Sequence, residues 1–133
     1  GYDAACELAE FSRMAEKLAQ DHWPGALTLV VNARAEAPLA EALFGEGRSL
    51  GIRIPDHPTT QALLAAYGAP LAASSANKSG EPPAHSAQEA LAALGDALAL
   101  VLDGPCDPQA PASTVVDARG ETLRVLRQGS VMV

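Results

Sequence analysis

The fold is decided by a continuous apolar run in the first quarter of the chain, Leu27-Thr28-Leu29-Val30-Val31, which is interrupted only by one threonine. A run of this length bounded by turn residues is typical of a buried strand. The run follows a turn at Pro24-Gly25, and the amphipathic pattern in front of that turn predicts a helix over residues 3–20. The chain therefore begins with a helix followed by a buried strand.

Helices and strands continue to alternate along the rest of the chain. We predict helices over residues 37–44, 59–67 and 86–94, and strands over residues 50–54, 70–73, 99–102, 115–116 and 122–126. Polar loops rich in Ser, Asn, Gly and Pro separate several of these elements. This order predicts an α/β fold with a mixed parallel and antiparallel sheet.

The size and charge of the chain exclude several classes of protein. Its 133 residues suit one domain. Nine basic against 16 acidic residues give a net charge of −7, which disfavours duplex nucleic acid as the main ligand. No apolar run approaches the roughly 20 residues that span a membrane. Two cysteines are too few for a disulfide framework, so we expect a reduced protein of the cytoplasm that does not bind membranes.

The loop at residues 74–80, Ser-Ser-Ala-Asn-Lys-Ser-Gly, is the first candidate for a ligand site. It offers hydroxyls, a carboxamide, backbone amides and one ammonium directly after a predicted strand. Open α/β sheets bind ligands in loops at the carboxyl ends of their strands. An ordinary solvated turn has the same composition, so both interpretations stay open.

Three further positions carry chemistry that their neighbours lack. Arg53 lies among apolar strand residues and points either to solvent or into a cleft as a carboxylate or phosphate clamp. Arg127 follows the last predicted strand, where it either reaches a ligand or solubilises the terminus. Ser113 opens a strand, either as part of a site or as a turn cap. The histidines and cysteines share no metal-ligand spacing, so no metal site is predicted.

Six segments in order resemble the YrdC-like threonylcarbamoyl-adenylate synthases, and together they span nearly the whole chain. They are residues 22–30 (HWPGALTLV), 50–58 (LGIRIPDHP), 71–82 (LAASSANKSGEP), 100–104 (LVLDG), 113–117 (STVVD) and 126–129 (LRQG). The resemblance implies a YrdC/RibB-like fold, a twisted mixed sheet flanked by helices with a large cleft.

The same resemblance implies an activity. The family joins L-threonine, bicarbonate and ATP, with Mg²⁺ on the phosphates, into threonylcarbamoyl-AMP and releases pyrophosphate. The product supplies the modification of adenosine 37 in tRNA, which implies a tRNA-modifying transferase as partner. The implied binding residues are Ser75, Asn77 and Arg127 for the nucleotide, and Arg53, Ser113 and Thr28 for threonine or its carbamate. No catalytic side chain is implied.

Two family features are absent from the chain, a Pro-Thr-x-Thr turn and a Lys-x-Arg motif. We therefore expect residues 1–133 to be a single YrdC-like domain that lacks its N-terminal portion, inactive as it stands although the intact protein is a synthase. Two alternatives remain. One is a non-catalytic nucleotide- or RNA-binding module, with weak RNA binding. The other is the carbamoyl-transfer domain of a larger enzyme.

Overall fold

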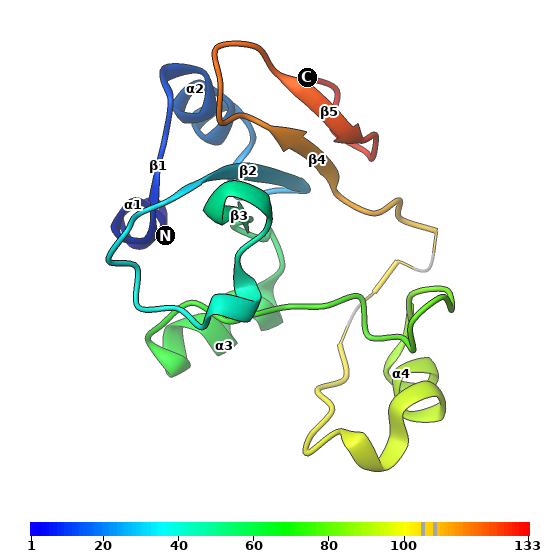
Figure 1. Ribbon diagram of the computed structural model, residues 1–133. Coiled ribbons are helices and arrows are strands. Elements are labelled where there is room, and N and C mark those ends of the chain that lie inside the picture. The colour runs from blue at the N-terminus through cyan, green and yellow to red at the C-terminus, as the bar shows by residue number, and fades with distance from the viewer. Residues whose placement is uncertain (105, 108) are drawn as a thin grey trace. The chain divides into compact units, whose positions relative to one another are not determined.

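The computed structural model describes residues 1–104, 106–107 and 109–133. The chain divides into two compact units, one formed by Gly1–Pro70 with Pro111–Val133 and the other by Leu71–Ala110. Among the described residues, the first unit contains the sheet and three of the four α-helices, and the second contains the fourth α-helix and the 3₁₀ turn Gly95–Ala97 (Figure 1).

The sheet is mixed, as the order of elements predicts. Its strands are β1 (Ala9–Glu10), β2 (Leu27–Ala33), β3 (Ser49–Ile52), β4 (Thr114–Asp117) and β5 (Arg124–Arg127). The long central strand β2 pairs antiparallel with β3 and parallel with β4, and β5 runs antiparallel along β4. The short β1 pairs antiparallel with the carboxyl end of β2. The α/β fold with a mixed sheet is therefore confirmed.

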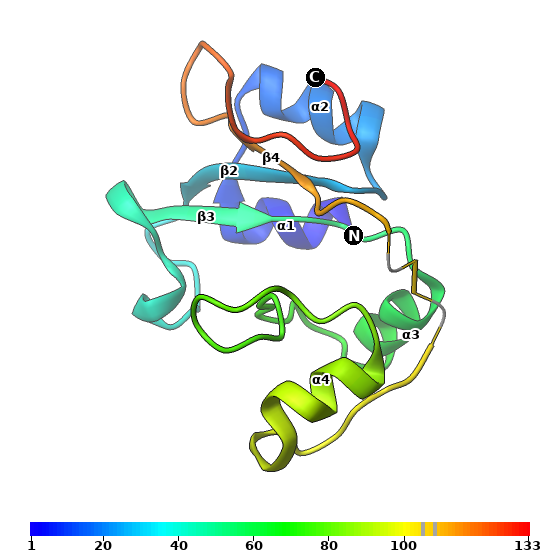
Figure 2. The same cartoon turned by 90° about the vertical axis from the view of Figure 1, so that its right-hand side faces the viewer.

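Alternation along β2 separates a core face from a second face. Leu27, Leu29 and Val31 are completely buried, and they pack with Val116 of β4 and with the apolar side of α2 (Arg13–His22). Figure 2 shows α2 lying to one side of β2 and β4. Thr28 and Val30 point the other way and are only half-buried. The apolar run is thus a strand with one fully buried face, and its lone threonine faces away from the core.

The single helix predicted over residues 3–20 is wrong. The chain instead forms α1 (Tyr2–Leu8), the strand β1 and then α2. Ser12 causes the second start, because its hydroxyl accepts a hydrogen bond from Ala15 N and caps α2. The same hydroxyl donates to Ala118 O, which ties the cap to the chain beyond β4. Between the helices, Ala9 is fully buried and pairs with Ala33.

The connections around β3 follow the prediction only in part. The helix predicted over residues 37–44 is wrong, because only Glu41–Leu43 forms a 3₁₀ turn there. A second 3₁₀ turn, Glu46–Arg48, follows after Phe44 and Gly45, and neither turn has a buried residue. The helix predicted at 59–67 is confirmed as α3 (Pro58–Tyr67). It ends at Gly68, whose φ of +73° is a left-handed conformation that suits glycine.

In the second unit, α4 (Ala87–Leu94) confirms the predicted helix. Its cap is Ser86, whose hydroxyl accepts from Glu89 N, and the Glu89 carboxylate accepts in return from His85 N. The strands predicted at 70–73 and 99–102 are wrong, because these residues pair with no other strand among the described ones. Leu100 is 75% exposed, so apolar sequence alone has not buried this segment. No helix in the described ranges has the length and apolar character needed to cross a membrane.

Candidate ligand-binding site

Three of the predicted binding residues meet at one end of the sheet. Thr28 Oγ1 lies 2.9 Å from Ser113 Oγ in a hydrogen bond that either hydroxyl can donate. Arg127 Nη2 donates to Ser113 Oγ at 3.1 Å, and its Nε donates to Ser113 O at 3.0 Å. A guanidinium and two hydroxyls from three different segments thus share one site around Ser113.

The parallel register of β2 and β4 explains how the hydroxyls meet. Leu27 pairs with Thr114 and Thr28 with Val115, so Thr114 faces the core together with Leu27. Ser113, one residue earlier, points to the opposite face, where Thr28 lies. The Ser113 side chain is nearly enclosed, at 9% exposed, although it is polar. Its hydrogen bonds to Thr28 and Arg127 compensate for that burial.

A bulge between Val115 and Val116 places the arginine. Val116 pairs with Val125 of β5, whereas Val115 pairs with Arg127 instead of the intervening Leu126. Without the shift, Leu126 would lie opposite Val115, and Arg127 would lie opposite Thr114. Bulges re-aim side chains in this way near functional sites. Here the bulge brings the guanidinium back onto Ser113.

The positive charge of Arg127 is available to a ligand. Within the described part of the chain, no carboxylate forms a salt bridge with it, and both of its hydrogen bonds go to neutral oxygens of Ser113. The residue is also exposed. An exposed guanidinium held by neutral groups is suited to pair with a phosphate or carboxylate.

Arg53 belongs to the same end of the sheet but does not contact the cluster directly. Its Nε donates to Gly25 O at 2.8 Å, and Gly25 N donates to Ile54 O at 2.8 Å. The register that pairs Leu29 with Ile52 would next pair Thr28 with Arg53, so the two share a face. Partial burial of the guanidinium lowers the pKa of Arg53, which stays cationic.

The residue pattern predicts a turn at Gly25 but does not identify Gly25 as the partner of Arg53. A Cβ at Gly25 would collide with the backbone oxygen of His22. Only glycine therefore lets the backbone at residue 25 lie so close to His22 O, in the conformation that presents the Gly25 carbonyl oxygen to Arg53. The Pro-Gly turn was the one available signal.

Ser75 and Asn77 lie in the second unit. Asn77 Nδ2 donates to Lys78 O and Glu81 O, both at 2.9 Å, so the carboxamide closes the loop on itself. Its Oδ1 is buried and accepts no hydrogen bond among the described residues. Ala76 between them has φ +53°, a left-handed conformation that is strained for a residue with a Cβ. Ser75 is exposed.

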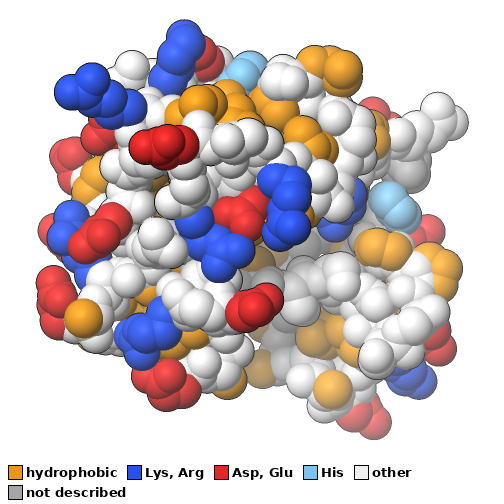
Figure 3. Space-filling view, turned by 45° about the horizontal axis from the view of Figure 1, so that its top comes forward, with side chains coloured by type: hydrophobic (Ala, Val, Ile, Leu, Met, Phe, Trp, Pro, Cys, Tyr) orange, Lys and Arg blue, Asp and Glu red, His pale blue; other side chains and the backbone are white. Residues whose placement is uncertain are grey.

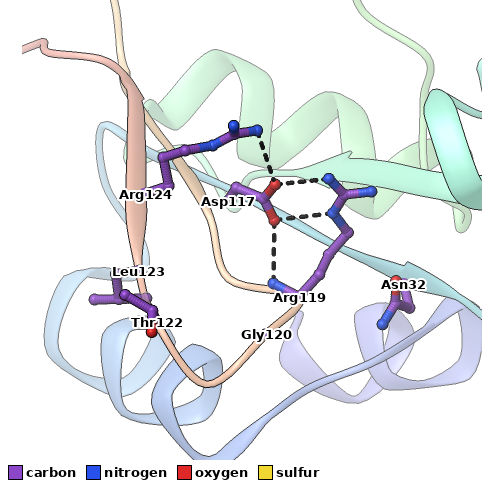
Figure 4. A pocket seen from close by; sticks show the side chains of 7 residues that line it. All are labelled: Asn32, Asp117, Arg119, Gly120, Thr122, Leu123 and Arg124. Carbon is purple, nitrogen blue, oxygen red and sulfur yellow. Dashed lines mark hydrogen bonds and ion pairs between the residues drawn. The ribbon is translucent and has the colours of Figure 1, made fainter.

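A second polar region lies at the opposite end of β4, around an open cavity of about 630 Å³ (Figure 4). Its main feature is Asp117, which pairs with Arg119 Nη2 at 2.7 Å and with Arg124 Nη2 at 3.5 Å. The hydrogen bonds from Arg119 hold the pKa of Asp117 down to about 2. None of the predicted binding residues lines this cavity, and the Asp117 carboxylate already has two arginine partners. We therefore interpret the region as an intramolecular ion-pair cluster at the surface.

Metal binding and surface charge give no further site. Among the residues with described positions, no group of three or more His, Cys, Asp and Glu side chains could hold a metal ion. On the face drawn in Figure 3, basic side chains lie beside acidic ones. A continuous basic surface, as phosphate-backbone binding requires, is not present on that face.

The open mixed sheet, with a hydroxyl and guanidinium cluster at one end, defines an α/β protein with a candidate site for an anionic ligand. Residues 2–129 match the Sua5/YciO/YrdC family, described as "Telomere recombination". The chain belongs to this family.

Relatives of known name agree with that assignment. The threonylcarbamoyl-AMP synthase of Chromohalobacter salexigens is 46% identical over 124 residues, which are 91% of this chain and 62% of the relative. The crystal structure of P. abyssi Sua5 complexed with L-threonine superposes with a TM-score of 0.88 at 31% identity, covering 97% of this chain and 38% of that one. E. coli YciO gives a TM-score of 0.77 at 27% identity, with 97% and 62% covered. The chain thus spans 62% of the length of the Chromohalobacter salexigens synthase.

Proposed function

We propose that this chain carries the substrate-binding part of an L-threonylcarbamoyl-AMP synthase, an ATP-dependent nucleotidyltransferase. The observation that carries the proposal is the Thr28–Ser113–Arg127 cluster, which offers an unneutralised guanidinium and two hydroxyls at one sheet end. The names of the relatives and the threonine bound to the Sua5 relative support the same assignment.

The reaction places defined demands on these side chains. The threonine amine combines with bicarbonate, with loss of water, to give a carbamate. A carbamate oxygen then attacks the α-phosphorus of ATP, forms a P–O bond and displaces pyrophosphate. Both reactants are anions, so the protein must screen their charge and align them. We assign Arg127 to the nucleotide phosphates, and Arg53 to the carboxylate or carbamate of threonine.

The hydroxyl groups supply orientation. Ser113 Oγ accepts from Arg127, and it keeps a proton and a lone pair to share between Thr28 and a ligand. We assign Ser113 and Thr28 to the threonine side of the site, and Ser75 and Asn77 to the nucleotide. The buried Oδ1 of Asn77 lacks a hydrogen bond among the described residues, which supports a ligand donor at that position.

In this proposal Mg²⁺ arrives as part of the MgATP substrate. Mg²⁺ prefers carboxylate oxygens and substrate phosphates. The cluster contains no carboxylate, and Asp117 is already paired with Arg119. No step is therefore assigned to a metal held by this chain.

Four wider assignments complete the proposal. The two compact units form one YrdC-like domain, which is supported by a family match that extends across both. The protein acts in the cytoplasm and passes its product to a tRNA-modifying transferase. RNA binding by this chain is weak, as its net charge of −7 suggests.

Thermal shifts with MgATP, with L-threonine and with both ligands test the proposal. Each ligand should raise the unfolding temperature, and both with bicarbonate should raise it further. Arg127→Ala should weaken nucleotide binding by about 1–3 kcal/mol. Arg53→Ala should mainly weaken threonine binding. Arg124→Ala is the matched control. Arg124 lies on β5 like Arg127, but it pairs with Asp117 at the other end of β4, away from the cluster.

Three outcomes would count against the proposal. Stabilisation by RNA, or by MgATP when L-threonine gives no stabilisation at all, would favour the non-catalytic module. Equal loss of both ligands in Arg53→Ala would show that Arg53 is misassigned. An unchanged nucleotide affinity in Arg127→Ala would leave that residue as part of the surface. Pyrophosphate release from ATP, threonine and bicarbonate then tests whether this chain alone turns over.

A further inference from the structure

Directly beside Ser113, a second hydrogen-bond network occupies the core face of β4. Thr114 is fully buried. Its hydroxyl donates to Val131 O at 2.7 Å and accepts from Gly129 N at 3.0 Å and from Val131 N at 3.1 Å. A threonine hydroxyl has one proton and two lone pairs. One short segment of chain therefore uses its whole hydrogen-bonding capacity.

The segment bound by Thr114 lies unusually close to the start of β4. A Cβ at Gly129 would collide with Ala112 O and would lie 2.5 Å from Thr114 N and 2.6 Å from the carbonyl carbon of Ser113. Real Cβ atoms do not approach backbone that closely, so only glycine fits. Two residues later, Val131 packs against the apolar core. The segment at 129–131 is thus held by hydrogen bonds, by close backbone contact and by burial.

These contacts fix the chain on the far side of Arg127. On the near side, the bulged ladder places Arg127 opposite Val115. On the far side, Gly129 follows after a single residue and is tied to Thr114. The backbone of Arg127 is therefore anchored on both sides, although the side-chain hydrogen bonds of Arg127 to described residues all go to Ser113.

We propose that Thr114 is a positioning residue for Arg127: its buried hydroxyl clamps the segment at 129–131, so that the guanidinium stays on Ser113. In its consequence for ligand binding, this inference rests on the proposed function of Arg127. Its structural content, the ordering of the Arg127 side chain, does not depend on that function. Thr114 itself never reaches the face that carries the site.

The decisive comparison is between three variants of the whole chain. Thr114→Val keeps the shape but removes the hydroxyl, which leaves two N–H groups and one carbonyl of the segment unsatisfied. Thr114→Ser keeps the hydroxyl and should rescue the wild-type behaviour. Val116→Ala, fully buried on the same face of β4, loses stability without removing a hydrogen bond to the segment and is the matched control.

The first readout is the Arg127 Nε–H signal in ¹H–¹⁵N spectra, which is assigned by its loss in Arg127→Lys. In the wild type this proton is bound to Ser113 O, so its exchange with solvent should be slow. Thr114→Val should speed that exchange by about tenfold, with Thr114→Ser and Val116→Ala within about twofold of the wild type. If Thr114→Val does not fold, Thr114→Cys replaces it, since a thiol is only a weak hydrogen-bond donor and acceptor.

The second readout is MgATP affinity by calorimetry. Thr114→Val should weaken it by about tenfold, and the same change on an Arg127→Ala background should have almost no effect, because the positioned group is gone. Unchanged exchange in Thr114→Val, or an equal effect in Thr114→Ser, would overturn the inference. If MgATP does not bind the wild type, the proposed function fails, while the exchange measurement still decides the role of Thr114.

Discussion

Gly129→Ala should be among the most destabilising single-methyl changes in the chain. The added Cβ would lie 2.5 Å from Thr114 N and 2.6 Å from the Ser113 carbonyl carbon, and it would overlap Ala112 O. Ordinary contacts of this kind are about 3.5 Å, and all three obstructing atoms are backbone that cannot rotate away. Relief requires the segment to move off β4 by about 1 Å, with loss of the hydrogen bonds to Thr114.

The cost combines overpacking with broken hydrogen bonds. Overpacking costs about 1–3 kcal/mol, and each buried group left unsatisfied adds about 1 kcal/mol or more. We expect a loss of about 3–4 kcal/mol in the free energy of unfolding. Urea denaturation followed by circular dichroism measures it, with Gly120→Ala as control. A Cβ at Gly120 would meet no atom within 4 Å, so that variant should stay within about 0.5 kcal/mol of the wild type.

Two results would refute this reasoning. A cost for Gly129→Ala below about 1 kcal/mol would mean that the close approach to β4 is not maintained in solution. A similar loss in Gly120→Ala would mean that glycine is needed for general flexibility in this part of the chain. In either case the clamp on the segment at 129–131 would have to be abandoned.

Two further predictions concern the ends of β4 and α2. The hydrogen bonds from Arg119 lower the pKa of Asp117 to about 2, so the pair contributes stability that is complete above the ordinary Asp pKa and is lost as pH falls toward 2. Asp117→Asn should lower the free energy of unfolding by about 1–2 kcal/mol at pH 7. It should also reduce the loss of stability between about pH 4 and pH 2, measured by urea denaturation at each pH. An unchanged loss over that pH range would assign it to other carboxylates. Ser12→Ala removes the bonds to Ala15 N and Ala118 O and should cost about 1–2 kcal/mol, while Ser12→Asp, which retains a cap acceptor, should recover part of it; equal losses would contradict the capping role.

Local patterns predicted the elements whose signals are complete in a short stretch. The helix α3 has Pro58 in its first turn and Gly68 at its end, and α4 has the Ser86–Glu89 capping box. The front of the chain misled because apolar spacing continues from α1 into α2. Serine is a common helix cap, but residue 12 stands out as one only once the strand before it is known. That strand depends on the pairing of Ala9 with Ala33, a partner far along the chain.

The strand predicted at 70–73 is wrong because the segment has no pairing partner among the described residues, whereas Ala9 has one that the sequence does not reveal. Short apolar runs have the composition of a strand, but a strand exists only where another edge accepts its hydrogen bonds. Leu71 remains 42% exposed, and Leu100, in the other apolar run that forms no strand, is 75% exposed. Apolar composition predicted burial that these segments do not have.

The candidate site could be named from the sequence but not assembled from it. Family resemblance selected Thr28, Ser113 and Arg127, although Ser113 and Arg127 each had an ordinary alternative role. Their mutual contacts depend on the parallel register of β2 and β4 and on the bulge before Val116. Neither leaves a mark in the residues themselves, because Val115 and Val116 are the same amino acid and either could have faced the core.

Consecutive residues on opposite faces also explain why the site and the core constrain each other. A shift of β4 by one residue would turn Ser113 into the core and Thr114 onto the site face. The buried hydroxyl of Thr114 would then lose three partners, all of which lie on the core side. That penalty falls only on the shifted register, so it selects the register in which Ser113 meets Thr28 and Arg127. A polar residue buried in the core thus contributes to the geometry of a site that it does not touch.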